Sequence, residues 1–353
     1  MPQRVSIRDL ARMAGVSPAT VSLALRDSDE VSAATRARVQ ALAREHDYRS
    51  HPALSMVMGQ VSRGIRLHDE EIIALIRSGI EADEKAPGQR ELLAGASEEA
   101  HRLGYRLETF WAGYKAANSR ALARVLYHRG IRGVIWSTMP SPHPPIDFPW
   151  ERFVPIACSL SPLVPRLPTV TTHHVNSMAT ALRELTTLGA RRIGFLGWYS
   201  EDFRQNFGWS NGVHLYKLRG GTATVIPLLT PEDPDWSAIR TWIASERIDT
   251  LVATQGMIDG ATSIAPDLPA ASLDIPTSEL GRLGGLYQDT ARIGRHTVRS
   301  LALRLVHGIT GLPEESFSVL TEATFVDGPS LHPRKTPRPR KRRNEAKSSS
   351  KRV

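Results

Sequence analysis

Apolar residues recur at helical spacing in three short segments near the start of the chain, residues 7–14, 18–25 and 33–45. In each segment they stand about three or four positions apart, which places them on one face of a helix. These positions are Ile7, Leu10, Ala11, Ala14, Val21, Leu25, Val39, Leu42 and Ala43. The pattern predicts three helices that close a very small core.

Each predicted helix has its own start signal. Ser6 precedes the first helix, and Asp9 stands three residues later as in a capping box. Ser17 and Ser32 precede the second and third helices, and Gly15 supplies a tight turn between the first two. Two helices joined by a glycine-containing turn are typical of a helix-turn-helix, whose second helix enters the DNA major groove. The alternative is a small helical bundle that binds no nucleic acid, but three start signals together favour DNA binding.

From residue 70 onward, short apolar runs alternate with helical patterns. Strands are expected at 71–76, 106–111, 133–137, 154–158, 169–172, 192–197, 224–229 and 250–254, and helices at 89–103, 118–128, 176–188, 212–218 and 237–245. Such alternation specifies parallel sheets covered by helices, and this number of strands suits two successive doubly wound subdomains. The predicted fold class is an all-α helix-turn-helix head followed by an α/β body of two doubly wound parallel-sheet subdomains.

Composition fits a globular protein of the cytoplasm. The chain has 353 residues, of which 41% are hydrophobic. No secretory signal is present, and no apolar run approaches the ~20 residues that cross a bilayer. The single cysteine, Cys158, excludes an intrachain disulfide and fits a reducing compartment.

Charge is distributed unevenly along the chain. Residues 333–353 hold ten Lys and Arg against one Glu, which accounts for the whole net charge of +9. Residues 1–64 carry nine Arg against six acids, so residues 65–332 carry a small negative charge. A basic head joined to an acidic body fits a DNA reader with a regulatory unit. The basic tail lacks apolar periodicity and is expected to be disordered, either as a solvated end or as a non-specific phosphate contact.

The N-terminal segment resembles the DNA-binding domain of the lactose- and galactose-repressor (LacI) family of bacterial transcription regulators. The motifs that carry the resemblance are Arg8-Asp9-Leu10-Ala11, Ala14-Gly15-Val16-Ser17, Ala19-Thr20-Val21-Ser22, Val31-Ser32, Thr35-Arg36 and Tyr48-Arg49. A weaker resemblance runs to about residue 328 and includes residues 188–197, 284–311 and 325–328. It implies a periplasmic-binding-protein-like body, a ligand cleft between its two subdomains, a homodimer, and a short hinge helix after the head.

These observations divide the chain into five parts. We expect the DNA-binding head at 1–50, a hinge helix or linker at 51–66, and a disordered basic tail at 331–353. The first subdomain is expected at 67–171 with 289–318, and the second at 172–288 with 319–330.

The resemblance also assigns roles in the head and hinge. The expected DNA-binding residues are Ser6, Ser17, Pro18, Ala19, Thr20, Ser22, Leu23, Arg26, Ser32, Tyr48 and Val57. Pro18, Ala19 and Leu23 match positions that read major-groove edges, yet none can donate a side-chain hydrogen bond. Readout is therefore expected to use thymine methyl groups and DNA shape, while most of the polar residues contact phosphates. Val57 aligns with the family's leucine wedge in the minor groove.

Candidates for effector binding follow the predicted strands, because ligands of such sheets bind beyond the strand carboxyl ends. They are Trp136, His173, Arg204, Gln255 and Asp274. Asp274 matches the family's acid, whereas His173-His174 and Gln255-Gly256 replace its usual polar pairs, and Arg204 stands one residue out of register with its effector-clamping arginine. A histidine at 173 favours a ligand with an acidic or acceptor group.

An enzymatic function receives little support. The stretch Gly208-Trp209-Ser210-Asn211-Gly212 matches the G-x-S-x-G pattern of hydrolases, but no strand is expected directly before it. His173 and His174 are neighbours that would face opposite sides of a strand, and no nucleotide or metal motif occurs, so neither a cofactor nor a metal is expected. The sequence therefore predicts a dimeric transcriptional regulator, most simply a repressor, that binds a pseudo-palindromic operator and a small-molecule effector. The alternatives are an effector-independent architectural DNA-binding protein and a Ser210 hydrolase.

Overall fold

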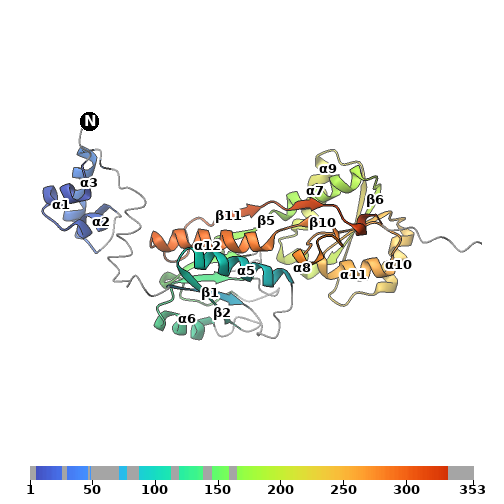
Figure 1. Ribbon diagram of the computed structural model, residues 1–353, viewed down its shortest axis with the longest axis horizontal. Coiled ribbons are helices and arrows are strands. Elements are labelled where there is room, and N and C mark those ends of the chain that lie inside the picture. Colours follow the sequence, from blue (N-terminus) through green and yellow to red (C-terminus); the bar gives the residue numbers. More distant parts are fainter. Residues whose placement is uncertain are drawn as a thin grey trace, which may run out of the picture. The chain divides into compact units, whose positions relative to one another are not determined.

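The computed structural model describes residues 5–25, 30–46, 48, 71–77, 87–112, 119–137, 145–158 and 165–332 (Figure 1). The chain divides into two compact units, Met1–Thr171 with Thr290–Val319 and Thr172–Asp289 with Leu320–Val353. The chain thus passes from one unit to the other three times. The predicted hinge, 51–66, and almost all of the predicted basic tail lie outside the described residues.

The N-terminal part of unit 1 contains three helices, α1 (Ile7–Ala14), α2 (Pro18–Leu25) and α3 (Ala33–Glu45). Their buried side chains form one small cluster that includes Leu10, Val21 and Val39, each fully buried. The three helices predicted from apolar spacing are confirmed. We call residues 5–48 the head.

The rest of unit 1 is built on a six-stranded sheet with the strand order β11-β5-β4-β3-β1-β2. Its elements are β1 (Glu71–Arg77), α5 (Pro87–Arg102), β2 (Tyr105–Trp111), α6 (Ser119–His128), β3 (Gly133–Trp136), β4 (Val154–Cys158), β5 (Thr169–Thr172), α12 (Thr290–Val306) and β11 (Ser318–Thr321). Ile73 and Leu75 of β1 face α5 and α12, whereas Ala74 and Ile76 face α6. Alternate residues of the strand therefore fill cores on both sheet faces, as expected for a doubly wound sheet.

Helices α5 and α12 touch at backbone distance. A Cβ atom at Gly294 of α12 would clash with the carbonyl oxygen of Leu92, and one at Gly95 of α5 would clash with the carbonyl of Ala291. The same helix pair encloses Glu99, whose side chain is 2% exposed and accepts hydrogen bonds from Arg102 and Arg299. Small residues thus permit the contact and a buried ion pair fixes it.

Unit 2 is built on a second six-stranded sheet with the order β12-β10-β9-β8-β6-β7. Its strands are β6 (Arg192–Trp198), β7 (Thr224–Thr230), β8 (Thr250–Ala253), β9 (Ala270–Ser272), β10 (Gly284–Tyr287) and β12 (Thr324–Val326), and its helices are α7 (His174–Thr187), α8 (Tyr199–Arg204), α9 (Gly208–Leu218), α10 (Trp236–Ser245) and α11 (Gln255–Ile264). Phe195 belongs to the core under α7 and α9, and Leu196 to the core under α10 and α11.

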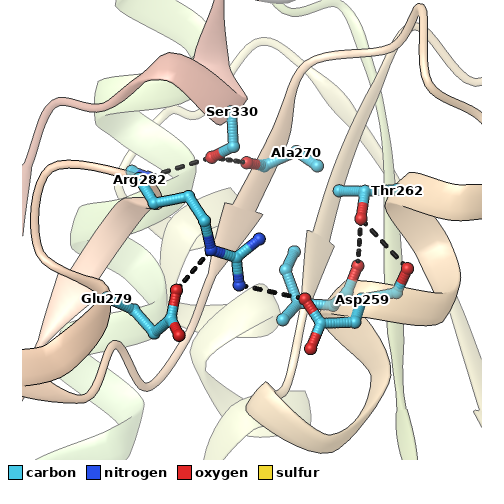
Figure 2. A network of polar contacts seen from close by, with 8 residues as sticks. Asp259, Thr262, Ala270, Glu279, Arg282 and Ser330 are labelled. Atoms are coloured by element: carbon cyan, nitrogen blue, oxygen red, sulfur yellow. Dashed lines mark hydrogen bonds and ion pairs between the residues drawn. The ribbon is translucent and has the colours of Figure 1, made fainter.

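Polar contacts close the amino-terminal edge of the second sheet (Figure 2). Arg282, in the loop before β10, donates to Glu279 and to Oδ1 of Asp259 on α11, the latter at 3.0 Å. Ser330 accepts from the Gly284 amide at 2.9 Å and donates to the Ala270 carbonyl at 2.7 Å. These contacts hold the last described turn of the chain against the starts of β9 and β10.

The α/β fold class predicted from the sequence is confirmed, with several differences of detail. Strand β12 pairs antiparallel with β10, so the second sheet is not wholly parallel. Helix α8 was not predicted, because its six residues are too few to show a clear apolar period. Among the helices of the described residues, none has the length and apolar character that spanning a membrane requires.

Candidate functional site

The first two helices of the head are held by their caps. Ser6 Oγ accepts from the Asp9 amide, and the Asp9 carboxylate accepts from the Ser6 amide at 3.0 Å, which completes the predicted capping box. The Ser6 hydroxyl also donates to Asp9 Oδ2 at 2.6 Å, and this bond, followed by the one from the Ser6 amide, lowers the pKa of Asp9. Gly15 adopts φ 63°, a left-handed conformation that ends α1 and sets the turn into α2.

Helix α2 is positioned by contacts at both of its ends. Ser17 Oγ accepts from the Thr20 amide at 3.1 Å and lies 2.9 Å from Thr20 Oγ1. At the other end, Gln40 of α3 donates to the carbonyl of Ala24 at 3.2 Å, which satisfies one of the carbonyl groups that a helix leaves unpaired. These contacts at both ends fix the position of α2 within the head.

The structure leaves most of the predicted DNA-binding residues accessible. Ser6, Ser17, Ala19 and Ser32 are exposed, and Pro18, Thr20, Leu23 and Tyr48 are half-buried. Ser22 differs from these residues, because it lies next to Val21 on the core side of α2 and is 8% exposed. Arg26 and Val57 lie outside the described residues.

Sequence reasoning missed several basic residues of the head. Arg8, Arg12, Arg38 and Arg44 are exposed on α1 and α3. Arg12 is paired with Asp9 at 3.3 Å while its own side chain is 80% exposed. Exposed arginines of this kind suit phosphate contacts.

In unit 2, two histidines mark the start of α7. His173 is the N-cap of α7, and its Nδ1 accepts from the Asn176 amide at 3.3 Å. His174 is buried edge-on against Trp209, with 4.7 Å between ring centroids. Burial, and next the charge of His173, lowers the pKa of His174 to about 3. His174 is therefore a neutral packing residue, whereas His173 is half-buried.

The segment after β6 folds around a single carboxylate. Asp202 of α8 accepts from the Trp209 amide at 3.0 Å and from the Ser210 hydroxyl at 2.5 Å. It thereby caps α9, whose N-cap residue Phe207 is left-handed at φ 55° and provides no side-chain cap. Ser210 lies inside α9 and α8 separates it from β6, so the strand–turn–helix of a nucleophile elbow does not form here.

The remaining effector candidates of unit 2 lie at the carboxyl edge of the second sheet. Arg204 ends α8, Gln255 begins α11, and Asp274 follows β9, all of them half-buried. Sequence reasoning missed Gln288, which is buried beyond β10 and accepts from Thr172 Oγ1 at 2.7 Å. Its amide also donates to the carbonyl of Leu273, so Gln288 connects Thr172 to the residue that follows β9.

Trp136 does not line a ligand site in the structure. It is the last residue of β3 rather than a residue beyond the strand, and its side chain is fully buried in unit 1. Phe148 and Trp150 pack against it with centroid distances of 5.7 and 5.8 Å. Since these rings enclose the indole, the expectation for Trp136 is corrected to a core position.

Comparison with known proteins gives matches in the head and over most of the chain. The family model described as bacterial regulatory proteins, lacI family, matches residues 6–51. The HTH-type transcriptional regulator MalR of Streptococcus pneumoniae is 23% identical over 308 residues, covering 79% of this chain and 90% of MalR. The maltose regulon regulatory protein MalI of Escherichia coli K12 is 25% identical over 236 residues, covering 66% of this chain and 63% of MalI.

Two solved structures extend the comparison to the fold. The transcriptional regulator CelR in complex with cellobiose has a TM-score of 0.58 at 18% identity, covering 92% of this chain and 99% of CelR. The Lac repressor dimer bound to operator and the anti-inducer ONPF has a TM-score of 0.51 at 20% identity, with 92% of this chain and 98% of that chain covered. At this level of identity the likeness establishes a shared fold.

Proposed function

We propose that this chain, which belongs to the lacI family of bacterial regulatory proteins, acts as a dimeric repressor under the control of a small-molecule effector. It is a sequence-specific, DNA-binding transcriptional regulator. The capped head carries this conclusion, because α2 is fixed at both ends and presents Ser17 and Ala19 to solvent.

Dimerisation follows from the size of the head. One head of three short helices reads few base pairs, and two heads related by a twofold axis read a pseudo-palindrome. The Lac repressor, whose structure is that of a dimer on its operator, supports this proposal. We place this regulator in the cytoplasm, where the bacterial chromosome lies.

The effector is proposed to bind among His173, at the start of α7, and Arg204, Gln255 and Asp274, at the carboxyl edge of the second sheet. CelR with cellobiose and Lac repressor with ONPF provide the precedent of small ligands in proteins of this fold. An effector alters DNA affinity only when it binds two conformations of the protein unequally. No catalytic role is proposed, since the hydroxyl of Ser210 is engaged by Asp202.

Selection of binding sites from random double-stranded DNA tests the proposal with the full-length protein. The expected result is one pseudo-palindromic motif, protected in a footprint at physiological salt. An architectural DNA-binding protein would give no motif and an affinity that depends on salt alone. Sedimentation of the protein–DNA complex then distinguishes one bound dimer from a monomer.

A further inference from the structure

Three buried oxygen atoms without a hydrogen-bond partner occur close together at the carboxyl edge of the second sheet. They are Oε2 of Glu201, Oε1 of Gln205 and Oγ1 of Thr254. An unpaired buried polar group costs about 1–3 kcal/mol, and native proteins leave few of them. The Thr254 hydroxyl is the one donor of the group and acts on Glu201, so the group has more acceptors than donors and suits a ligand that donates.

The backbone brings the three side chains together. Glu201 and Gln205 are four residues apart and share a helix face, and the Gln205 amide donates to the Glu201 carbonyl at 3.2 Å. Thr254 follows β8, the neighbour of β6, and its amide donates to the Leu196 carbonyl at 3.2 Å. The Thr254 side chain is 1% exposed, and its methyl lies 3.3 Å from where a Cβ of Gly197 would be.

The chemistry of the site agrees with this placement. Burial raises the pKa of Glu201, whereas the neighbouring Thr254 hydroxyl and the charge of Arg204 lower it. Asp202, the next acid along α8, is already used by the amide and hydroxyl groups of α9. Glu201 is thus the acid of α8 that remains for a ligand.

A cation stands beside these acceptors. Arg204 lies three residues after Glu201, on the same face of α8, and is half-buried. Among the residues that the structure describes, it has no hydrogen-bond or ion-pair partner. The edge therefore presents a group of acceptors next to a guanidinium with five N–H donors.

We propose that this edge binds a zwitterionic small molecule of the amino-acid class. Its ammonium group would donate to Glu201, Gln205 and Thr254, and its carboxylate would pair with Arg204. The proposal rests on the proposed function, because it identifies the chemical class of that regulator's effector.

Two charge arguments favour a zwitterion over a neutral polyol. A primary ammonium has three N–H donors, which match three acceptors, and a carboxylate accepts two parallel hydrogen bonds from a guanidinium. Sugar hydroxyls would satisfy the acceptors only with neutral hydrogen bonds, which are weaker than the charge-assisted bonds that an ammonium and a carboxylate form.

The aromatic residues of α8 add a preference for the ligand's side chain. Tyr199 and Phe203 stack with 6.2 Å between ring centroids, and Phe203 and Phe207 meet edge to face at 5.7 Å. Tyr199 and Phe203 share a face of α8 by their spacing of four, and Phe207 packs on both rings from the start of α9. Amino acids with an apolar or aromatic side chain are expected to bind best.

The test uses the full-length protein and its selected operator. Calorimetry measures binding of the twenty proteinogenic L-amino acids, of their N-acetyl derivatives, and of maltose and cellobiose as neutral sugars, and anisotropy measures operator affinity with each. We expect at least one amino acid to bind and to change operator affinity, while its N-acetyl derivative, which lacks the ammonium, binds at least about tenfold more weakly.

Variants locate the site. Glu201→Gln is expected to weaken binding of the amino acid by about tenfold or more, and Arg204→Met is expected to weaken it to the same extent. The matched control is Glu232→Gln, which removes an exposed carboxylate that accepts from Ser200 at 2.8 Å and is expected to leave binding unchanged. If Glu201→Gln fails to fold, the comparison of free and N-acetylated amino acids on the wild-type protein still tests whether the ammonium group of the ligand is recognised.

Two results would overturn the proposal while the proposed function stands. The first is specific operator binding whose affinity no amino acid changes. The second is an operator affinity that a sugar changes to the same extent in the wild-type protein and in Glu201→Gln. Failure of the wild-type protein to select any DNA motif would instead overturn the proposed function itself.

Discussion

Replacing Glu99 by Gln removes the buried charge at the contact between α5 and α12. Glu99 is 2% exposed, and its two oxygens accept from Arg299 at 2.7 and 3.2 Å and from Arg102. The arginine side chains are about half exposed, at 59% for Arg102 and 48% for Arg299. The variant keeps the shape of the side chain and loses its charge-assisted bonds.

The expected magnitude follows from the pKa of Glu99. Hydrogen bonds from Arg102 and then from Arg299 lower this pKa from 4.5 to about 2. At about 1.4 kcal/mol per pKa unit, the ionised form stabilises unit 1 by about 3 kcal/mol at most. Because water screens the two half-exposed guanidinium groups, we expect Glu99→Gln to lower the free energy of unfolding by about 2 kcal/mol at pH 7.

The pH dependence has a definite sign. The folded pKa lies below the unfolded one, so the stabilisation is complete above pH 4.5 and is lost as the pH falls toward 2. The difference between wild type and Glu99→Gln should therefore shrink by about a quarter at pH 4 and by about half or more at pH 3.

Native-state hydrogen exchange of peptides from α5 and α12 measures this difference for unit 1 alone, after correction for intrinsic exchange rates. Glu98→Gln is the control, because Glu98 is 70% exposed and lies 3.6 Å from Arg295, and a change below about 0.5 kcal/mol is expected. Equal protection in wild type and Glu99→Gln at pH 7, or a difference that grows at low pH, would refute the reasoning.

Four further predictions concern DNA reading, the effector and packing. Ala19→Gln should change the operator motif selected from random DNA, whereas Thr20→Ala should weaken all operators alike; an unchanged motif for the first would contradict the assignment. Val57→Gly should lower specific affinity in gel-shift titrations and Val57→Leu should keep or raise it, and equal affinities would indicate a passive linker. Asp274→Ala should leave basal operator binding near normal and abolish the effector response in the same titration, and a full response would show that the residue lies outside the site. Gly294→Ala should lower the unfolding free energy of unit 1 by about 2 kcal/mol or more, because its Cβ meets a backbone carbonyl of α5; unchanged exchange protection would argue against that contact.

Much of the architecture could be predicted because its signals are local. The capping box of Ser6 and Asp9 and the turn at Gly15 are encoded within four residues each and appear in the structure as expected. Strand β1, Glu71–Arg77, is also predicted by a local signal, because a parallel strand that is buried on both faces is a nearly continuous apolar run.

Site residues were harder to predict, because their roles depend on contacts distant in sequence. Trp136 was placed at the edge by its position near a strand end, but Phe148 and Trp150 return to enclose it. The cluster of Glu201, Gln205 and Thr254 depends on α8, whose end requires left-handed residues at Asn206 and Phe207 that no sequence pattern marks.

The threefold passage of the chain between the two units has a consequence for synthesis on the ribosome. Unit 1 lacks α12 and β11 until residue 319 has been made, and Glu99 meets Arg299 across 200 residues. At translation rates of about 5–20 residues per second, α5 waits roughly 10–40 seconds for its partner helix. During that interval the apolar face of α5 and the strands beneath it are uncovered, while most of unit 2 is being made. The nascent chain is therefore most exposed to chaperones and proteases in its earlier half, and a truncation anywhere before α12 leaves that half without a finished core.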